Sequence, residues 1–256
     1  RSPEAADRRA ARPGRQRGDR GPLRRSASKV LTVSDLISEP LPYPSKLEPV
    51  PLPEGPLQLW RPLDPETVLD ALVEAPADPD DKMPYWSDLW ASAVGLAEAV
   101  EQTEIDVSGR SVLELGCGLG LCSLAAARAG ATRVRATDWD PEALRYVAAS
   151  AGENGLAVET GLLDWREAPP TPEADVILAA DVVYEARNVP WLVRLCRRWV
   201  RGSVELWVSD PGRKWADRFA EEVGGLGLRV DRSSRTVPAS AAVRRGADLT
   251  FYRVRT

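Results

Sequence analysis

The chain has 256 residues, of which 43% are apolar and 28% are charged, and it contains no histidine. This length suits one globular domain with extensions. The lack of imidazole excludes Ser-His-Asp or Cys-His catalysis and histidine-based metal sites, so we expect no metal. The net charge is −4, but nine arginines and Lys29 against three acidic residues give residues 1–29 a charge of +7, which leaves −11 for residues 30–256. The acidic charge of residues 30–256 excludes general nucleic-acid binding, because binding to phosphates requires a basic surface.

The cysteine content and the hydropathy pattern favour a soluble intracellular protein. The three cysteines form no CxxC pair and are too few for a disulfide framework, which favours a reducing, cytoplasmic environment. No apolar run approaches the ~18 residues that a membrane-spanning helix needs, so we expect no membrane partner.

Residues 1–29 are predicted to be a disordered basic tail. They are rich in Arg, Ala, Gly, Pro and Ser, and so little apolar area cannot offset the entropy of ordering. An arginine-rich, acid-poor N-terminus is also typical of a mitochondrial transit peptide, which leaves the mitochondrial matrix open as a second location. Prolines and glycines interrupt any amphipathic helix there, and this favours a plain solvated tail.

Residues 30–83 are expected to form an N-terminal extension. Seven prolines within residues 40–56 predict an extended connector without a helix. Residues 57–60 are predicted to be a short strand. A helix over about residues 64–75 begins with an Asp-Pro pair, in which the aspartate caps the helix and the proline takes its first position.

Residues 84–256 alternate short apolar segments with amphipathic ones and are expected to form the main domain. Ser87 or Asp88 is predicted to cap a first helix that carries Leu89 and Trp90. Further helices are predicted at about 121–129, 140–154, 188–200 and 214–223, and strands at 112–115, 134–138, 156–162, 175–180, 203–209, 227–236 and 248–255. This alternation predicts an α/β fold with a doubly wound, mostly parallel seven-stranded sheet and helices on both faces.

A glycine-rich loop joins the first of these strands to the following helix. Gly116, Gly118 and Gly120 alternate with other residues directly after Glu114 and Leu115. Bare backbone lets a ligand pack closely, and the N–H groups of the helix point toward it. The third glycine does not stand where the dinucleotide fingerprint needs it, and no Walker lysine follows.

These residues resemble the class I S-adenosylmethionine-dependent methyltransferases, which have a Rossmann-like fold. Three further strand ends support the resemblance. Asp138 ends the second strand, where a carboxylate can accept hydrogen bonds from both ribose hydroxyls. Trp165 follows the third strand, where an indole can stack on adenine. Ala180 and Asp181 close the fourth strand, next to the reactive end of the cofactor.

Three stretches are similar to methyltransferase family 16, the seven-strand protein-lysine methyltransferases. They are residues 90–96, which match W-x-x-A-x-x-L, residues 163–165, which match L-x-W, and residues 181–184, which match D-x-x-Y. The resemblance implies that Asp181 and Tyr184 face the methyl-accepting nitrogen. The cofactor-binding residues expected from the glycine loop and the resemblance together are Trp90, Glu114, Gly116, Cys117, Gly118, Gly120, Asp138, Trp165 and Ala180.

Two segments look most like the branch that methylates lysines of the electron-transfer flavoprotein β subunit. Residues 84–86 precede the first helix as Pro-Tyr-Trp, and residues 209–213 follow the fifth strand as Ser-Asp-Pro-Gly-Arg. The chain departs from that branch at residues 90–94, which read Trp-Ala-Ser-Ala-Val where the branch usually has W-P-G-G-Q. The expected partner is a protein that bears a lysine, and no feature of the sequence indicates the oligomeric state.

Structural roles compete with these functional ones. Trp90 could be plain core, Trp165 could serve packing alone, Asp181 could be a loop cap, and Tyr184 a buried phenol. Residues 209–213 could be only a tight turn that ends in a solvated arginine. Two other functions also stay open: methylation of a small-molecule amine on the same fold, and cofactor binding by a catalytically silent interaction protein.

Overall fold

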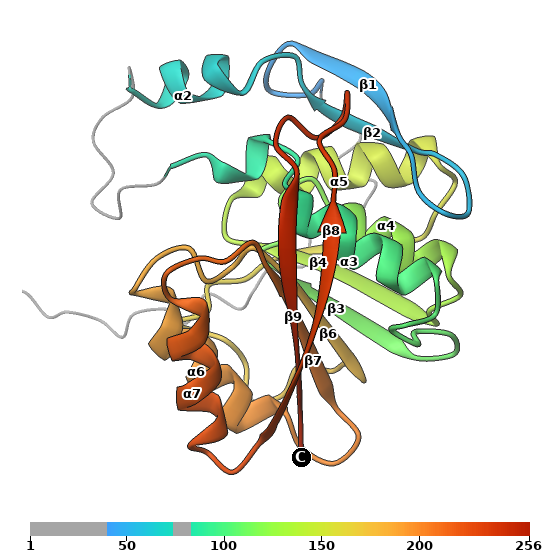
Figure 1. Ribbon diagram of the computed structural model, residues 1–256. Helices are drawn as coiled ribbons and strands as arrows, with labels where there is room; N and C mark the ends of the chain where they lie inside the picture. Colours follow the sequence, from blue (N-terminus) through green and yellow to red (C-terminus); the bar gives the residue numbers. More distant parts are fainter. Residues whose placement is uncertain (1–39, 74–82) are drawn as a thin grey trace, which may run out of the picture.

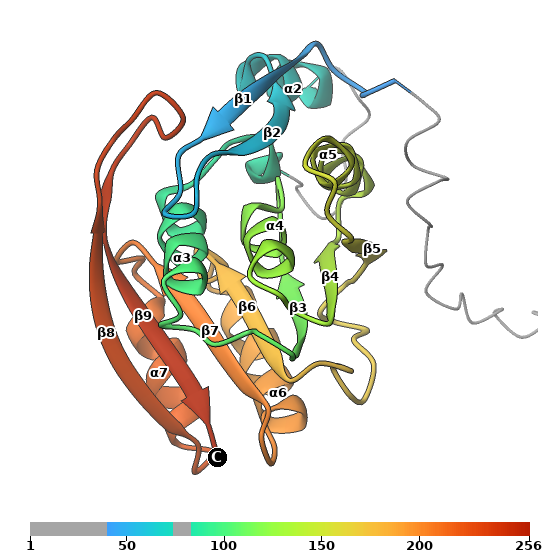
Figure 2. The same ribbon diagram turned by 90° about the vertical axis from the view of Figure 1, so that its right-hand side faces the viewer.

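The computed structural model describes residues 40–73 and 83–256, so the predicted basic tail lies outside the described residues. A seven-stranded sheet forms the centre of the molecule, in the order β5-β4-β3-β6-β7-β9-β8 (Figures 1 and 2). The strands are β3 (Ser111–Leu115), β4 (Arg133–Asp138), β5 (Glu159–Leu162), β6 (Val176–Ala180), β7 (Glu205–Asp210), β8 (Arg229–Val237) and β9 (Ala247–Arg255). The first five are mutually parallel, and β9 runs antiparallel to both of its neighbours. The predicted doubly wound, mostly parallel seven-stranded sheet is confirmed.

Helices cover both faces of this sheet (Figure 2). One face carries α3 (Ala91–Glu101), α4 (Leu121–Arg128) and α5 (Pro141–Glu153), and the other carries α6 (Asn188–Trp199) and α7 (Ala216–Gly224). The buried apolar residues accordingly form two clusters, one under each helical layer. Burial of apolar surface on both faces explains why the central strands read as continuous apolar runs rather than alternating ones.

The cap signals in the sequence place two helix starts correctly. Asp140 Oδ1 accepts a hydrogen bond from the backbone N–H of Glu142 at 2.9 Å, and Pro141 takes the first position of α5. The Asp-Pro pair at residues 64–65 starts α2 (Pro65–Val73) in the same way. A side-chain acceptor before a helix satisfies an N–H that has no partner within the helix.

Two predicted elements were wrong in detail. The connector predicted for residues 40–56 contains a strand, β1 (Ser45–Val50), which pairs antiparallel with β2 (Leu57–Pro62). Prolines are tolerated because a two-stranded sheet consists only of edge strands, whose N–H groups are not all needed for pairing. The first helix of the main domain begins at Ala91, with Trp90 as its capping residue, and a short 3-10 turn (Tyr85–Ser87) precedes it.

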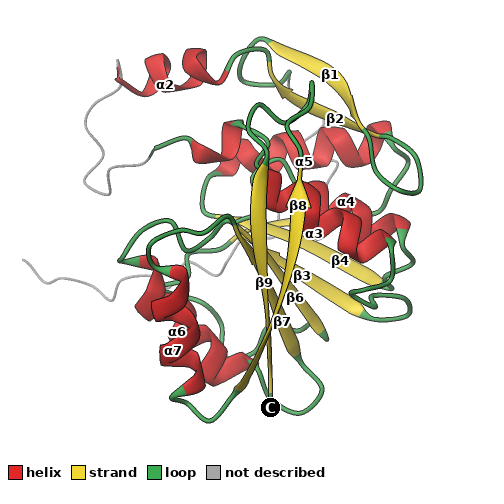
Figure 3. Cartoon of the chain, in the orientation of Figure 1, coloured by secondary structure: helices red, strands yellow, loops and turns green. Residues whose placement is uncertain are grey.

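The β1–β2 hairpin packs on α5 rather than standing free (Figures 2 and 3). The backbone N–H of Trp60 donates to Ser150 Oγ at 2.9 Å, and the N–H of Gln58 donates to Asn154 Oδ1 at 2.9 Å. Leu57 and Leu59 are buried in the core cluster of that face. The helix therefore satisfies backbone donors of β2 that its strand partner leaves unpaired.

Within residues 40–73 and 83–256, no helix is long and apolar enough to cross a bilayer.

Candidate functional site

A cleft that is open to solvent lies at the carboxyl ends of the parallel strands. Five segments build it: residues 83–93 before and within α3, the β3–α4 loop, the end of β4, the β5 loop at Trp165, and the β6–α6 loop. Its lining residues are Met83, Tyr85, Trp86, Asp88, Leu89, Trp90, Ala93, Gly116, Cys117, Gly118, Leu119, Gly120, Leu121, Asp138, Trp139, Trp165, Ala180, Asp181, Val182 and Tyr184. All the residues that sequence analysis predicted for the site lie in this wall except Glu114.

The glycine loop has a backbone that only glycine adopts easily. Gly116 and Gly120 have φ values of +61° and +79°, in the left-handed region. A Cβ on Gly120, which precedes α4, would stand 2.6 Å from Val147 of α5. A side chain at residue 120 would therefore force α4 and α5 apart. The loop is anchored to β4, because the N–H of Cys117 donates to the carbonyl of Thr137 at 2.9 Å.

Asp138 lies under this loop at the end of β4. Its Oδ2 accepts a hydrogen bond from the N–H of Gly118 at 2.9 Å, and its Oδ1 accepts one from the N–H of Asp140 at 3.0 Å. Burial raises the pKa of Asp138 to about 6, although these two bonds act in the opposite direction. A carboxylate has about four acceptor positions, so Asp138 can bind a hydroxyl while it still holds the loop.

Glu114 takes a different place from the one expected. Its Oε2 accepts hydrogen bonds from the N–H and the Oγ of Ser123 in α4, at 2.9 and 2.5 Å. The side chain is fully buried, and this burial raises its pKa to about 7. In the structure Glu114 joins β3 to α4 and does not reach the cleft. Alternation along a strand explains this position, since neighbouring residues face opposite sides of a sheet.

Four tryptophans line the cleft, Trp86, Trp90, Trp139 and Trp165. Trp90 begins α3, and its Nε1 donates to the carbonyl of Tyr85 at 2.9 Å. Trp165 lies on Gly116, where its Cζ2 would be 3.3 Å from an added Cβ. Sequence analysis missed Trp139, which also lines the cleft. Its position directly after the strand-end carboxylate was the signal that could have identified it.

A second cavity adjoins the first and shares Gly116, Trp139, Trp165 and Tyr184 with it. Its remaining wall comes from the β5 loop and the start of α6, including Leu163, Asp164 and Trp191. Arg194 of α6 fixes the loop from behind, because its Nη2 donates to the carbonyls of Trp165 and Arg166. The two cavities therefore share part of their wall, including Gly116 and Trp165.

The end of the cleft at Asp181 is organised by an ion pair that sequence analysis did not predict. Asp181 accepts two hydrogen bonds from Arg213, Nε to Oδ1 at 2.8 Å and Nη2 to Oδ2 at 2.7 Å. The Asp181 side chain is only 6% exposed, whereas that of Arg213 is 37% exposed. The guanidinium also lies over the ring of Trp90, 5.6 Å from its centre.

The backbone on both sides of this pair is held in place. Asp181 has a φ of +53°, an unusual value for a residue with a side chain, and its N–H donates to the carbonyl of Ser209 at 2.8 Å. Residues 209–213 do form the expected tight turn, in which Asp210 Oδ1 accepts from the N–H groups of Gly212 and Arg213. The alternative expectation of a merely solvated arginine is wrong, since the guanidinium is committed to Asp181.

Tyr184 closes the same side of the cleft. Its ring packs edge-on against that of Tyr85, with 5.0 Å between the centres. Burial raises the pKa of Tyr184 to about 12, with the nearby Glu185 carboxylate adding to the effect. The phenol is therefore protonated at neutral pH, so it can donate a hydrogen bond but cannot act as a base.

The cysteines offer no nucleophile in this site. All three are unpaired and buried, and burial raises the pKa of Cys117 and Cys122 well above the usual value. A thiol in this state is unreactive. Among the described residues, no group of histidine, cysteine or carboxylate side chains could hold a metal ion.

Comparison with known proteins agrees with this arrangement. The model of the lysine methyltransferase family matches residues 85–220, which include the whole cleft except Met83. The chain belongs to this family. The predicted membership is thus confirmed, and the matched range covers the glycine loop, the aromatic walls and the Asp181–Arg213 pair.

Proteins named as lysine methyltransferases are also found by sequence similarity. The chain is 34% identical to the protein N-lysine methyltransferase METTL21A of Danio rerio over 144 residues, 53% of this chain and 65% of that protein. It is 32% identical to the electron transfer flavoprotein beta subunit lysine methyltransferase of Xenopus laevis over 134 residues, 51% of this chain and 53% of that protein. The chain thus matches less than two thirds of the length of these relatives.

Solved structures resemble the fold at low identity. Trm5b from Pyrococcus abyssi aligns with a TM-score of 0.53 and 16% identity, over 84% of this chain and 57% of that chain. Magnesium protoporphyrin IX methyltransferase from Synechocystis, solved with bound SAH, aligns with a TM-score of 0.50 and 16% identity, over 74% of this chain and 95% of that chain. These two likenesses concern the fold alone.

Proposed function

We propose that this chain is an S-adenosylmethionine-dependent protein-lysine N-methyltransferase. The observation that carries the proposal is the meeting, in one cleft, of the glycine loop with Asp138 and the Asp181–Tyr184 segment, within the range that the lysine methyltransferase family matches. The names of the relatives support lysine as the acceptor.

The cleft fits the cofactor. Gly116 leaves bare backbone at the base of the cleft, Asp138 keeps acceptor positions for ribose hydroxyls, and Trp165 offers an indole face for adenine. Trp139 adds a second aromatic wall on the adenine side. The bound cofactor supplies a methyl group on a sulfonium, which an amine can take by in-line displacement.

The residues of the chain then have to present a neutral amine in line with that methyl group. Lysine in water has a pKa near ~10.4, so its ammonium must lose a proton before it can attack. The rings of Tyr85, Trp90 and Tyr184 shield the mouth of the cleft partly from water. This partial burial favours the neutral amine, because burial penalises the charged form. Fixed orientation of the reacting groups supplies much of the remaining catalysis.

Asp181 has a positioning role in this proposal. Both carboxylate oxygens already accept from Arg213, so the side chain is better suited to orient the amine than to remove its proton. Tyr184 remains a phenol at neutral pH and can wall the site or donate a hydrogen bond. Solvent at the open mouth of the cleft takes the proton.

An apolar rim favours a protein acceptor over a small amine. Met83 and Tyr85 are 40% and 41% exposed at the mouth of the cleft, so their apolar surface is available for contact with a protein partner. The electron transfer flavoprotein beta subunit is the first acceptor to test, because one of the relatives is named for it.

The test is incubation of the protein with isotope-labelled S-adenosylmethionine and three kinds of acceptor: cell-lysate proteins, purified electron transfer flavoprotein and simple alkylamines. Labelled methyl groups on lysines, located by mass spectrometry, would support the proposal. Label on alkylamines alone would favour a small-molecule methyltransferase, and tight cofactor binding without any labelled acceptor would favour a silent interaction protein.

The three unpaired cysteines are consistent with a reducing compartment. We propose the cytoplasm as the location, with the mitochondrial matrix as the alternative. Imaging of the tagged full-length protein distinguishes the two.

A further inference from the structure

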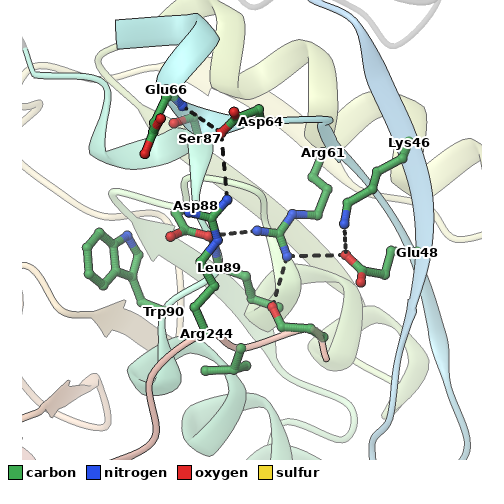
Figure 4. Close-up of polar contacts among 12 residues, drawn as sticks. Lys46, Glu48, Arg61, Asp64, Glu66, Ser87, Asp88, Leu89, Trp90 and Arg244 are labelled. Carbon is green, nitrogen blue, oxygen red and sulfur yellow. Dashed lines mark hydrogen bonds and ion pairs between the residues drawn. The ribbon is translucent and has the colours of Figure 1, made fainter. Parts of the chain in front are cut away.

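Arg61, on β2, lies outside the residues that the family model matches, yet it contacts the segment that walls the cleft. Its side chain is only 4% exposed. Nη2 donates to Asp88 Oδ1 at 2.7 Å, and Nη1 donates to Glu48 Oε2 at 3.3 Å and to the carbonyl of Ala242 at 2.9 Å (Figure 4). One guanidinium therefore joins three parts of the chain: β1, the segment before α3 and the β8–β9 connection.

The contact with Asp88 leads directly to the cleft. Asp88 Oδ1 also accepts the N–H of Leu89 at 2.8 Å, and Asp88, Leu89 and Trp90 all line the cleft. The carbonyl of Trp90 accepts from Ala93 at 3.0 Å as α3 begins. Fixing Asp88 thus fixes the extended backbone that leads to Trp90 (Figure 4), and the Trp90 side chain lines the cleft.

Arg61 is not needed to attach the hairpin to the domain. Gln58 and Trp60 already bond to α5, and Ser45 Oγ lies 2.9 Å from the hydroxyl of Tyr146 in the same helix. The bond of Arg61 to Asp88 leads to the cleft wall instead, and its bond to Ala242 reaches the β8–β9 connection. A buried charge is costly unless it is paired and hydrogen-bonded. The buried guanidinium of Arg61 therefore depends on its bonds to Asp88, Glu48 and Ala242.

Arginine suits this position better than lysine. Its planar fork can donate to several acceptors at once in a fixed geometry, whereas an ammonium on a flexible stem cannot hold three segments in register. The charge is balanced locally, since Glu48 and Asp88 face Arg61 and Lys46 pairs with Glu48 at 3.0 Å.

We propose that Arg61 is a positioning residue for the cofactor cleft, and that the β1–β2 hairpin is through it a working part of the methyltransferase site. The inference deepens the proposed function and rests on it. Arg61 acts through Asp88 on the Trp90 segment and does not itself reach the cleft.

The test compares Arg61→Met with a matched control, Arg235→Met. Arg235 is 15% exposed and pairs with two carboxylates, Glu98 at 2.9 Å and Glu104 at 2.6 Å, but it does not line the cleft. We expect Arg61→Met to weaken S-adenosylmethionine binding about tenfold in calorimetry, the factor for one lost charge-assisted hydrogen bond. Arg235→Met should lower the Tm about as much as Arg61→Met lowers it, but it should leave the Kd for S-adenosylmethionine unchanged. An unchanged Kd in folded Arg61→Met overturns the inference.

Two further variants keep the result decisive. Arg61→Lys retains the charge and is expected to weaken binding by an intermediate factor; if Arg61→Met does not fold, an unchanged Kd in Arg61→Lys overturns the inference. In a double-mutant cycle, Arg61→Met should add little to Asp88→Asn, because both break the same path. Full additivity would exclude a path through Asp88.

Hydrogen exchange separates this inference from the proposed function. The amides of residues 85–94 should exchange faster in Arg61→Met than in Arg235→Met, with no cofactor present. Equal exchange in the two variants overturns the positioning role. Failure of the wild-type protein to bind S-adenosylmethionine would instead refute the proposed function, whatever the exchange result.

Discussion

Asp181→Asn is the sharpest test of the acceptor side of the cleft. The substitution keeps the size of the side chain, but the amide presents only one oxygen to Arg213, so one of the two bonds of 2.7 and 2.8 Å is lost. Removal of one partner of a fully buried ion pair costs about 3–5 kcal/mol. Because the Arg213 side chain is 37% exposed and water can solvate it, we expect a stability loss of about 1–2 kcal/mol here.

The effect on turnover should exceed the effect on folding. If the carboxylate orients the acceptor amine, its loss should lower single-turnover methylation by about 10²-fold, the cost of a misplaced reacting group. The Kd for S-adenosylmethionine should stay nearly unchanged, because Asp138 and the glycine loop, on other strands, form the proposed cofactor contacts.

The assay pairs calorimetric binding of the cofactor with rapid-quench methylation of a lysine-bearing acceptor. Glu222→Gln is the control, since it breaks an exposed Arg218–Glu222 pair of 2.8 Å on α7, away from the cleft. Equal turnover in Asp181→Asn and wild type would refute the reasoning and leave Asp181 with a structural role. A parallel loss of cofactor affinity and turnover would place it among the cofactor contacts instead.

Three other outcomes follow from the site. Asp138→Ala should weaken cofactor binding by about 1.5–3 kcal/mol in calorimetry, because charge-assisted bonds to the ribose are lost, and unchanged affinity in a folded variant would refute this contact. Trp165→Ala should weaken binding by about 1–3 kcal/mol through lost stacking; an equal Kd would leave the ring a packing role only. Because burial raises the pKa of Glu114 from about 4.5 to about 7, the folded chain binds the extra proton and its stability falls as pH rises from 4.5 to 7, by about 3 kcal/mol. Glu114→Gln should flatten that slope in urea unfolding, and an unaltered slope would contradict the assignment.

Most of the architecture could be predicted from local signals. Continuous apolar runs, such as residues 176–180, and cap signals, such as Asp140 before Pro141, depend on neighbours only a few positions away. The order of strands and helices follows from their alternation, and with it the meeting of Gly116, Asp138 and Asp181 at one edge of the sheet. The residue types of the candidate site were therefore readable before the fold was known.

Packing between segments that are distant in the sequence decided the long-range contacts and the side-chain directions. Arg213 binds Asp181 across 32 positions, and Arg61 reaches Ala242 across 181, so neither pairing leaves a local pattern in the sequence. Glu114 follows a strand motif typical of a ligand contact, but its side chain points into the α4 layer, where Ser123 satisfies it. Side-chain direction and long-range charge pairing depend on how the layers stack, and this stacking exists only once the sheet has formed.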